Sequence, residues 1–322
     1  MAALASRIFG SLVRARERAY AEGRLGVARL PAPVISIGNL SVGGSGKTPT
    51  VIALGKLLRA RELRVDVLSR GYRRASRALA VAERGDEDVN QVGDEPRLIA
   101  QRLGAPVLVH PDRFRSGLEA ERRYATQIHL LDDGFQHRQL ARSFDLVLVS
   151  PDDLDGRLLP AGRLREPPAA LARAHAIVWV TPQAVTDPEA ELAAARERLA
   201  PFTPAPVFLA HKQPLPPDLP EGARPFAFCG LARPESFRQT LAELGIAPAG
   251  WRAFRDHHHY SGTDLRQLRA AARAAGADGF ITTAKDAMNL GGGLENLAVV
   301  EIEMRISDAP ALVALALRAC GR

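Results

Sequence analysis

The chain has 322 residues, 46% of them apolar and 25% charged, so it can bury one large core or two moderate ones and is not expected to be disordered. Its 43 basic and 36 acidic side chains leave a net charge of +7, which favours acidic partners such as nucleotides, phospholipid head groups or nucleic acid. Cys229 and Cys320 lie far apart, which argues against a disulfide framework or a zinc site and favours a reducing cytosol.

Residues 1–30 predict a helical region that lies either on a membrane surface or on the protein's own core. Residues 1–13 are mostly apolar and are followed by arginines, the reverse of the charge order in a secretory signal. Wound as a helix, the segment separates apolar side chains from basic ones, with Leu4, Ile8, Phe9, Leu12 and Val13 on one half and Arg7, Arg14 and Arg18 opposite. No stretch approaches the roughly 18 apolar residues of a spanning helix, so the chain is expected not to cross a membrane.

From residue 31 onward, short runs rich in β-branched residues alternate with helical stretches. The runs are residues 34–37, 65–68, 107–109, 129–131, 146–149, 177–180 and 207–209. Continuously apolar strands of this kind indicate a parallel sheet covered on both faces, with crossover helices expected at 95–103, 169–173 and 188–199. The predicted fold class is α/β, with a parallel sheet sandwiched by helices as in P-loop NTPases.

A proline-rich segment separates this series from a second one. Eight prolines lie between residues 201 and 225, which suits a linker and disfavours regular structure. Strands at 226–229, 279–282 and 298–302 and helices at 234–244 and 263–275 are expected after it. We therefore expect an amphipathic region at 1–30, a P-loop domain at 31–220 and a smaller C-terminal α/β domain at 221–322.

The strongest chemical signal is a glycine-rich loop between the strand at 34–37 and the helix expected at 49–59. Its sequence is Ser41-Val42-Gly43-Gly44-Ser45-Gly46-Lys47-Thr48. Glycines let backbone N–H groups turn toward phosphate oxygens, Lys47 can reach the β and γ phosphates, and the Thr48 hydroxyl can bind Mg²⁺. Ser41 replaces the usual first glycine, but the rest of the motif is intact. The alternative, a chance glycine turn, does not explain the strand before it and the helix after it.

Two adjacent carboxylates, Asp132 and Asp133, follow the strand at 129–131. A P-loop needs an acidic residue at the end of a neighbouring strand to hold or orient its metal, and Asp132 has that position. Neighbouring carboxylates repel one another unless a cation is near, although a solvated Asp-Asp-Gly turn remains an alternative. His137, four residues after Asp133, either points toward the phosphates or has no function in the loop.

Two further groups of residues are candidates for the site. Asp94 and Glu95 stand at an expected helix start, where Asp94 could accept a proton from an attacking hydroxyl or could serve only as a helix cap. Residues 256–260 read Asp-His-His-His-Tyr. Adjacent histidines in an extended loop cannot all face one metal ion, so one or two of them are expected to enter a cleft between the domains.

Two other classes of P-loop protein fit the sequence less well than a phosphotransferase does. A P-loop switch protein is not supported, because the sequence has no Asn-Lys-x-Asp string for reading guanine. A nucleic-acid-dependent ATPase fits the net charge, but aromatic residues make up only 5% of the chain and do not interleave with a basic patch. No nucleic acid and no obligate protein partner are therefore expected.

Taken together, the motifs resemble those of the tetraacyldisaccharide 4'-kinases of lipid A biosynthesis. The likeness runs from about residue 4 to residue 305 and rests on the strings Gly38-Asn39-Leu40-Ser41 through Pro49, Ser69-Arg70-Gly71-Tyr72, Gly93-Asp94-Glu95-Pro96, Asp132-Asp133-Gly134-Phe135-Gln136-His137, Leu158-Leu159-Pro160-Ala161-Gly162, Leu164-Arg165-Glu166-Pro167 and Asp256-His257-His258. Each string is weak alone, whereas their order and spacing are specific. Ala284 and Arg163 depart from the family pattern, where glutamate and proline are common.

The resemblance implies that the γ-phosphoryl group of ATP is transferred to the 4'-hydroxyl of a tetraacylated glucosamine disaccharide 1-phosphate, giving lipid IVA. It implies association with the cytoplasmic face of a bacterial inner membrane through the N-terminal helix. It also implies that Asp94 is the catalytic base, partnered by Asp133, and that Lys47, Thr48, Asp132 and Glu95 serve ATP and Mg²⁺. His137 and a histidine of the Asp-His-His string, His257 or His258, would lie near the reacting phosphates.

Overall fold

The computed structural model describes residues 2–71, 74, 76–290 and 293–322. Met1 of the N-terminal region and Tyr72 of the Ser-Arg-Gly-Tyr string lie outside the described residues.

The described strands form one sheet of twelve, in the order β10-β9-β11-β12-β8-β7-β6-β1-β5-β2-β4-β3. In chain order these strands are β1 (Val34–Asn39), β2 (Val65–Ser69), β3 (Ala80–Ala82), β4 (Val107–Val109), β5 (Ile128–Asp132), β6 (Phe144–Val149), β7 (Ala176–Thr181), β8 (Val207–Leu215), β9 (Phe226–Cys229), β10 (Gly250–Ala253), β11 (Phe280–Thr283) and β12 (Leu297–Ile306). The sheet is parallel apart from the β3–β4 and β8–β12 pairs. The α/β class and every strand expected from the sequence are confirmed.

The helices lie mostly between successive parallel strands. They are α1 (Ala2–Ala21), α2 (Lys47–Arg59), α3 (Val89–Val92), α4 (Asp94–Leu103), α5 (Arg113–Tyr124), α6 (Pro151–Leu154), the 3-10 helix η1 (Pro168–Arg173), α7 (Pro188–Leu199), α8 (Pro234–Glu243), α9 (Gly262–Ala274), α10 (Ala284–Met288) and α11 (Ala309–Ala319). The crossover helix expected at 169–173 is a short 3-10 segment, Pro168–Arg173.

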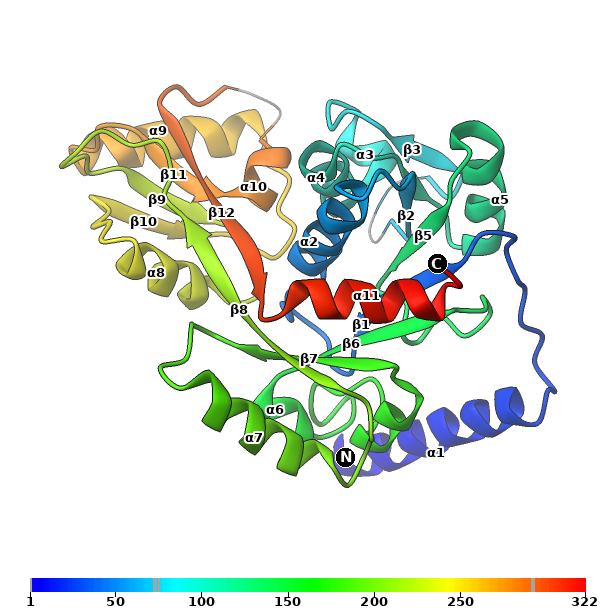
Figure 1. Ribbon diagram of the computed structural model, residues 1–322. Coiled ribbons are helices and arrows are strands. Elements are labelled where there is room, and N and C mark those ends of the chain that lie inside the picture. The colour runs from blue at the N-terminus through cyan, green and yellow to red at the C-terminus, as the bar shows by residue number, and fades with distance from the viewer. Residues whose placement is uncertain (1, 72–73, 75, 291–292) are drawn as a thin grey trace.

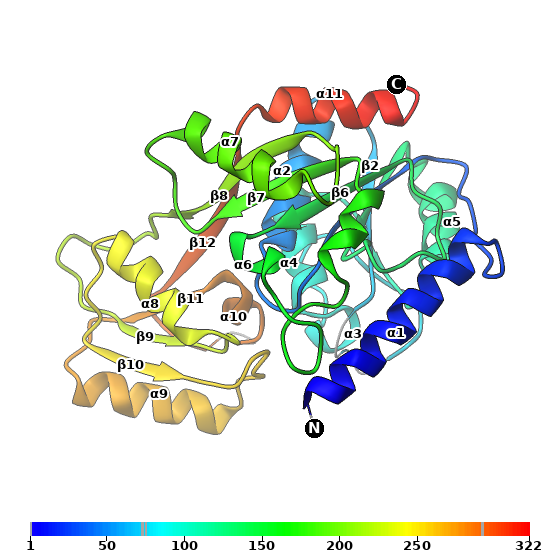
Figure 2. The same cartoon turned by 90° about the horizontal axis from the view of Figure 1, so that it is seen from below.

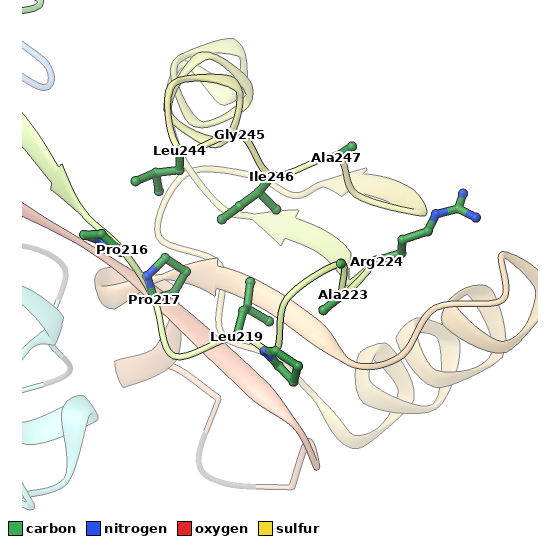
Figure 3. Close-up of a pocket in the computed structure, with 11 residues that line it drawn as sticks. Pro216, Pro217, Leu219, Ala223, Arg224, Leu244, Gly245, Ile246 and Ala247 are labelled. Carbon is green, nitrogen blue, oxygen red and sulfur yellow. The ribbon is translucent and has the colours of Figure 1, made fainter.

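The proline-rich segment is more regular than its composition predicts. β8 runs through residues 207–215 inside it, where only residues 207–209 were expected to be strand, and it pairs with β7 on one side and β12 on the other. Pro214 fits because β7 pairs with β8 only as far as His211, so the missing N–H interrupts no bond to β7. The prolines that follow line a surface pocket with residues 244–247, and none of the residues of this pocket belongs to the phosphate loop (Figure 3).

The two expected domains share the sheet through β12. Its first half pairs with β11 and its second half with β8, so one strand belongs to both parts of the molecule. Figure 1 shows α11 returning from this strand to lie beside α2, and Leu312, Val313 and Ala316 are buried in the core of the first part. Residues 309–319, which the sequence assigned to the C-terminal domain, therefore pack on the N-terminal one.

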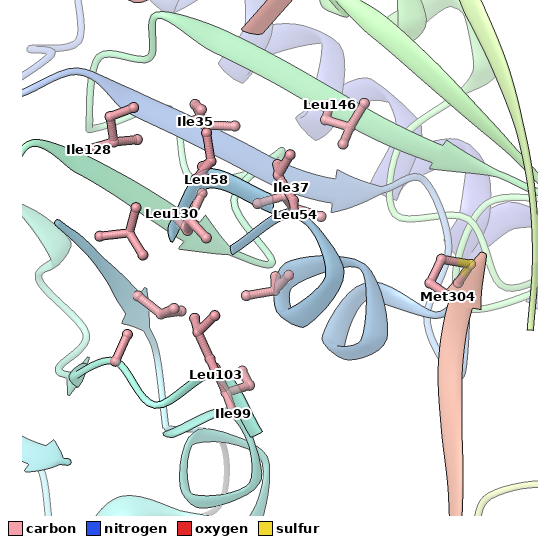
Figure 4. Close-up of a cluster of buried hydrophobic side chains, with 14 of the residues drawn as sticks. Ile35, Ile37, Leu54, Leu58, Ile99, Leu103, Ile128, Leu130, Leu146 and Met304 are labelled. Atoms are coloured by element: carbon pink, nitrogen blue, oxygen red, sulfur yellow. The ribbon is translucent and has the colours of Figure 1, made fainter. Parts of the chain in front are cut away.

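The main core lies between α2, α4 and α11 and one face of the central strands. Ile35 and Ile37 of β1 point into it together with Leu54 and Leu58 of α2, all with no exposed surface (Figure 4). The opposite face of the sheet is covered by α5, η1 and α7, through separate clusters that include Leu131 and Trp179. Covering on both faces explains why these strands are apolar at nearly every position.

Helix α1 is attached along one face and open along another (Figure 2). Gly10 packs against Leu158, and Glu17 is held by Arg138 and Arg173 at 2.6 and 2.7 Å. Leu4, Ile8 and Leu12 remain 64%, 57% and 65% exposed. The protein's own core therefore leaves these three side chains of the expected apolar half uncovered, whereas Phe9 and Val13 are half-buried. Among the described helices, none is both long and apolar enough to cross a bilayer.

A buried charged network ties β2, β5 and α5 together. His129 has no exposed surface, and its Nδ1 lies 2.9 Å from Asp66 Oδ2 while its Nε2 lies 3.1 Å from Glu121 Oε1. Burial lowers the pKa of His129, but hydrogen bonds to the two carboxylates and their charges outweigh it, so the pKa is raised. An imidazolium that donates to both carboxylates holds this part of the sheet.

Replacing His129 with glutamine should destabilise the protein by about 3–5 kcal/mol, because the buried Asp66 and the partly buried Glu121 lose their cation. The free energy of unfolding measured with urea checks this, with His211→Gln, a half-exposed site on β8, expected to change it by less than about 0.5 kcal/mol.

The same measurement has a defined pH dependence. Because the pKa of His129 is raised on folding, its stabilisation is complete below its ordinary pKa of 6.5 and is lost as the pH rises through the raised value. The difference between the wild type and His129→Gln should therefore shrink toward alkaline pH, and a constant difference between about pH 5 and about pH 9 would contradict the assignment.

Candidate active site

The phosphate loop joins the buried end of β1 to the first residue of α2. Gly43 and Gly46 have φ angles of +100° and +92°, which side chains other than glycine rarely adopt. Ser41, which replaces the usual first glycine, is only 4% exposed, and its carbonyl accepts a hydrogen bond of 2.7 Å from the side chain of Asn39. Ser41 therefore fits the loop without a glycine conformation, and helix α2 begins at Lys47, two residues earlier than expected.

Lys47 and Arg165 both contact Asp133. The Lys47 ammonium lies 3.5 Å from Asp133 and donates to Asn39 at 3.0 Å, while Arg165 donates to both Asp133 oxygens at 2.8 and 2.7 Å. Burial raises the pKa of Asp133, but the bonds to Arg165 and the charge of Lys47 outweigh it and hold the pKa well below its ordinary value. Asp133 is therefore an ionised anchor for two cations beside the loop.

Asp132 occupies the buried end of β5, where it is 5% exposed and accepts a hydrogen bond of 3.1 Å from Ser69. Burial, followed by the charges of Glu95 and Asp133, raises the pKa of Asp132 to about 7. Carboxylates that raise one another's pKa in this way call for a cation between them.

These donors fit Mg²⁺, which is usually bound by one or two carboxylates together with substrate phosphates and water. The described part of the chain has no cluster of three or more histidine, cysteine or acidic residues that could enclose a metal by itself. Thr48, Asp132 and Glu95 would be the oxygen donors on the protein for such an ion.

Asp94 and His257 form a hydrogen-bonded pair although 163 residues separate them. The His257 Nδ1 atom lies 2.8 Å from Asp94 Oδ2, and Asp94 is only 8% exposed. Burial raises the pKa of Asp94, but the bond to His257 and the charge of Lys285 outweigh it and lower the pKa, while the same bond raises the pKa of His257. In the structure Asp94 is hydrogen-bonded to a histidine and Asp133 to an arginine, and the catalytic partnership of Asp94 with Asp133 that the resemblance implies stays a prediction.

Helix α10 supplies further polar contacts to this pair. Lys285 lies 3.0 Å from His257 Nε2 and 3.5 Å from Glu95, and the Asn289 amide is 3.4 Å from Asp94. Arg97 of α4 also donates to the carbonyl of Met288 at 3.1 Å. The C-terminal part of the chain thus meets the start of α4 at the carboxylates.

The other expected histidines lie apart from this pair. His258 stacks on Phe254, with ring centroids 4.6 Å apart, and its Nε2 lies 3.2 Å from Asp264. Burial, followed by the charges of Arg113 and Arg142, lowers the pKa of His137 to about 3, so its ring is neutral and lies beside those arginines. The catalytic roles expected for His258 and His137 stay predictions.

Sequence reasoning missed several residues of the site. Arg165 and Asn39 stood inside the quoted motifs without a role, whereas Lys285 and Asn289 had no local signal that linked them to Asp94. Arg113 is 5% exposed at the first position of α5, and burial, together with the charge of Arg70, lowers its pKa to about 10. The signal available for it in the sequence was an arginine next to the helix cap Asp112, in the segment that follows the strand β4.

Gly38 allows the Asp-Asp-Gly-Phe turn to approach β1. A Cβ atom at Gly38 would lie 2.5 Å from Phe135 Cβ and 2.7 Å from the Phe135 backbone nitrogen. Gly38→Ala should therefore lower the free energy of unfolding by about 1–3 kcal/mol, because the turn that carries Asp133 must move. Thermal or urea unfolding measures this, and Gly44→Ala, whose added Cβ meets nothing within 4 Å, is the matched control. Equal stability of the two variants would contradict the close approach.

Comparison with known proteins agrees with the resemblance noted from the motifs. The family model described as tetraacyldisaccharide-1-P 4'-kinase matches residues 1–320. A tetraacyldisaccharide 4'-kinase of Koribacter versatilis is 43% identical over 95% of this chain and 94% of its own, and one of Aquifex aeolicus is 36% identical over 94% and 92%. A crystal structure of LpxK from Aquifex aeolicus in complex with ATP has a TM-score of 0.79 and 32% identity, and covers 98% of this chain and 96% of that one. The chain is a kinase and belongs to the tetraacyldisaccharide-1-P 4'-kinase family.

Proposed function

We propose that this enzyme uses ATP and Mg²⁺ to phosphorylate the 4'-hydroxyl of a tetraacylated glucosamine disaccharide 1-phosphate, forming lipid IVA in lipid A biosynthesis. The observation that carries the proposal is the convergence of the phosphate loop, the Asp132–Asp133 turn and the Asp94–His257 pair at one edge of the sheet, in a chain of this family. Carboxyl ends of parallel strands meet at that edge, which is where α/β folds bind their ligands.

Phosphoryl transfer needs little covalent participation from the protein, so alignment and neutralisation of charge do most of the work. Amides of residues 43–48 surround the phosphates, and Lys47 neutralises charge that builds on the transferred group. Thr48, Asp132 and Glu95 would hold Mg²⁺, which would supply further neutralisation of the phosphate oxygens. Asp133 and Arg165 keep Lys47 in place through the ion pairs described above.

The Asp94–His257 pair receives the proton of the attacking hydroxyl. A sugar hydroxyl is a poor nucleophile, and a base within hydrogen-bond reach improves it. Asp94 makes the imidazole of His257 more basic and fixes its orientation through the 2.8 Å bond to Nδ1. Lys285, 3.0 Å from Nε2, leaves that nitrogen when the hydroxyl binds, so that Nε2 can take the proton. The Asp94 carboxylate thus acts together with the ring rather than with Asp133.

The C-terminal part of the chain supplies His257 and also excludes water from the site. An open site would let water accept the phosphoryl group and waste ATP. β12 and β8 connect this part to the phosphate loop, and α10 contacts α4, so a small rotation about these strands can close the site.

The enzyme acts as a peripheral protein at the cytoplasmic face of a bacterial inner membrane, where its acylated substrate resides. Support comes from the exposed stripe of Leu4, Ile8 and Leu12 on α1 and from the arginines beside it. The stripe can enter the boundary between head groups and acyl chains while arginines meet anionic lipids.

The activity is tested by incubating the purified full chain with labelled ATP, Mg²⁺ and the tetraacylated acceptor in detergent micelles. Lys47→Ala should reduce transfer by at least about 10²-fold, because transition-state charge loses its nearest cation. Lys56→Met, a half-exposed lysine on the same helix, should stay close to the wild type. Nucleotide hydrolysis without labelled lipid in the wild type would contradict the proposed function.

The proton-accepting pair is tested with Asp94→Asn, His257→Gln and the double variant. Each single change should lower kcat by about 10²–10⁴-fold with little change in the KM for ATP, and the double variant should be scarcely worse than either single one. Asp187→Asn, at the N-cap of α7, where asparagine can still accept the backbone hydrogen bond, is the control for a change of the same chemistry elsewhere. Effects confined to ATP affinity would return Asp94 to a capping role.

The membrane role is tested by replacing Leu4, Ile8 and Leu12 with serine in one variant. Each apolar side chain contributes about 1.5–3 kcal/mol when buried, so cosedimentation with anionic vesicles should fall strongly. Because these side chains are exposed, thermal stability should stay close to that of the wild type. Leu118→Ser on α5, 43% exposed, is a control away from the stripe, and unchanged vesicle binding by the triple variant would refute the assignment.

A further inference from the structure

The two-stranded ribbon of β8 and β12 places two side chains in contact with the phosphate loop. Lys212 and Met304 are directly opposite one another in this antiparallel pair, so their side chains point to the same face. A Cβ atom at Gly46 would lie 2.4 Å from the end of Met304 and 3.3 Å from Lys212 Cε. The ribbon is therefore in van der Waals contact with the loop, and Figure 4 shows Met304 on its strand beside α2.

Lys212 brings a second ammonium group to this loop. Its Nζ donates to the carbonyl of Gly44 at 2.6 Å, on the opposite part of the loop from Lys47. Burial, followed by the charge of Lys47, lowers the pKa of Lys212, which places the two ammonium groups within electrostatic reach of one another. Lys47 has Asp133 as a counter-ion, whereas within the described residues no carboxylate forms an ion pair with Lys212.

The Lys212 ammonium is half-buried, lies near another cation and has only a carbonyl as its partner. The cost of burying its charge is therefore poorly compensated. The loop itself is folded inward, since the Ser45 N–H donates to the Gly43 carbonyl at 2.7 Å instead of facing outward to a ligand. Phosphate oxygens would satisfy both the loop amides and the second ammonium. The Gly44 carbonyl, by contrast, is next to solvent, because Gly44 is exposed, and water can replace Lys212 there.

We propose that Lys212 is a second phosphate-binding lysine, which leaves the Gly44 carbonyl and contacts the β or γ phosphate when nucleotide enters the loop. This inference rests on the nucleotide-binding part of the proposed function and adds a residue to it. Because β8 also pairs with β12, the contact makes the position of the C-terminal part depend on whether phosphate is present.

The test is isothermal titration of MgATP and MgADP into the full chain, without lipid acceptor. Lys212→Met should weaken MgATP binding by about 10–100-fold, the usual effect of losing a hydrogen bond to a charged group. Lys212→Gln can still donate an N–H to Gly44 but carries no charge, so it should be nearly as weak. Lys212→Arg keeps the charge and should retain more affinity than Lys212→Gln. Lys56→Met, also a lysine close to the ribbon, should bind as the wild type does.

Thermal unfolding of each variant without nucleotide separates binding from folding. Recovery of full affinity by Lys212→Gln would assign Lys212 to capping the Gly44 carbonyl and overturn the proposal, as would unchanged binding by Lys212→Met. A wild-type chain that does not bind MgATP would contradict the proposed function itself. Wild-type binding combined with an unaffected Lys212→Met variant would remove only the role of Lys212.

Discussion

The site depends on the cost of burying carboxylates at one edge of the sheet. Asp94, Asp132 and Asp133 are held there with little or partial exposure, and a buried carboxylate is stable only with a cation, a hydrogen-bond donor or a proton. Each of these three carboxylates is stabilised by a different partner. Asp133 binds Arg165 and Lys47, Asp94 binds His257, and Asp132 has a hydroxyl donor and a pKa raised to about 7. The carboxylate with the weakest compensation is the one best placed to receive a metal ion.

These compensating groups come from distant parts of the chain, which makes the site a product of the whole fold. Arg165 follows β6, whereas His257 and Lys285 come from the part after the proline-rich segment. The bonds between Asp94 and His257 and between Lys285 and Glu95 therefore join the two parts of the molecule at the site itself. Any movement of the C-terminal part therefore changes the environment of the Asp94 carboxylate.

A second connection runs from α1 to the phosphate loop. The Ser6 hydroxyl donates to the Leu158 carbonyl at 2.9 Å and accepts from the Ala161 N–H at 3.0 Å. These two hydrogen bonds attach the helix to the segment after α6. A few residues later the Val42 N–H donates to the Arg163 carbonyl at 2.8 Å, and the Arg163 guanidinium returns a bond of 2.7 Å to the Val42 carbonyl. Helix α1 and the phosphate loop are thus hydrogen-bonded to the same short backbone segment, which runs from Leu158 to Arg163.

The sequence by itself determined those features that depend on neighbouring residues. A buried strand, a glycine-rich turn and a following helix are a local pattern, and the placement of Asp132 at a strand end and of Asp94 at a helix start needed only the periodicity around them. Ten of the twelve described strands were expected for the same reason, since apolar runs between turn residues mark them, whereas β3 and β10 were not expected. Composition was less reliable, because the prolines concealed the second half of β8.

Tertiary structure alone decided which of these features meet. The partner of Asp94 is 163 residues away, and Arg165 reaches Asp133 because β6 and β5 flank β1 in the sheet. The way in which large apolar surfaces are covered decides the strand order, the antiparallel pairing of β12 with β8 and the return of α11 to α2. This covering cannot be predicted from a local sequence pattern. Lys212 approaches the phosphate loop for that reason, since only the ribbon formed by two distant strands brings it there.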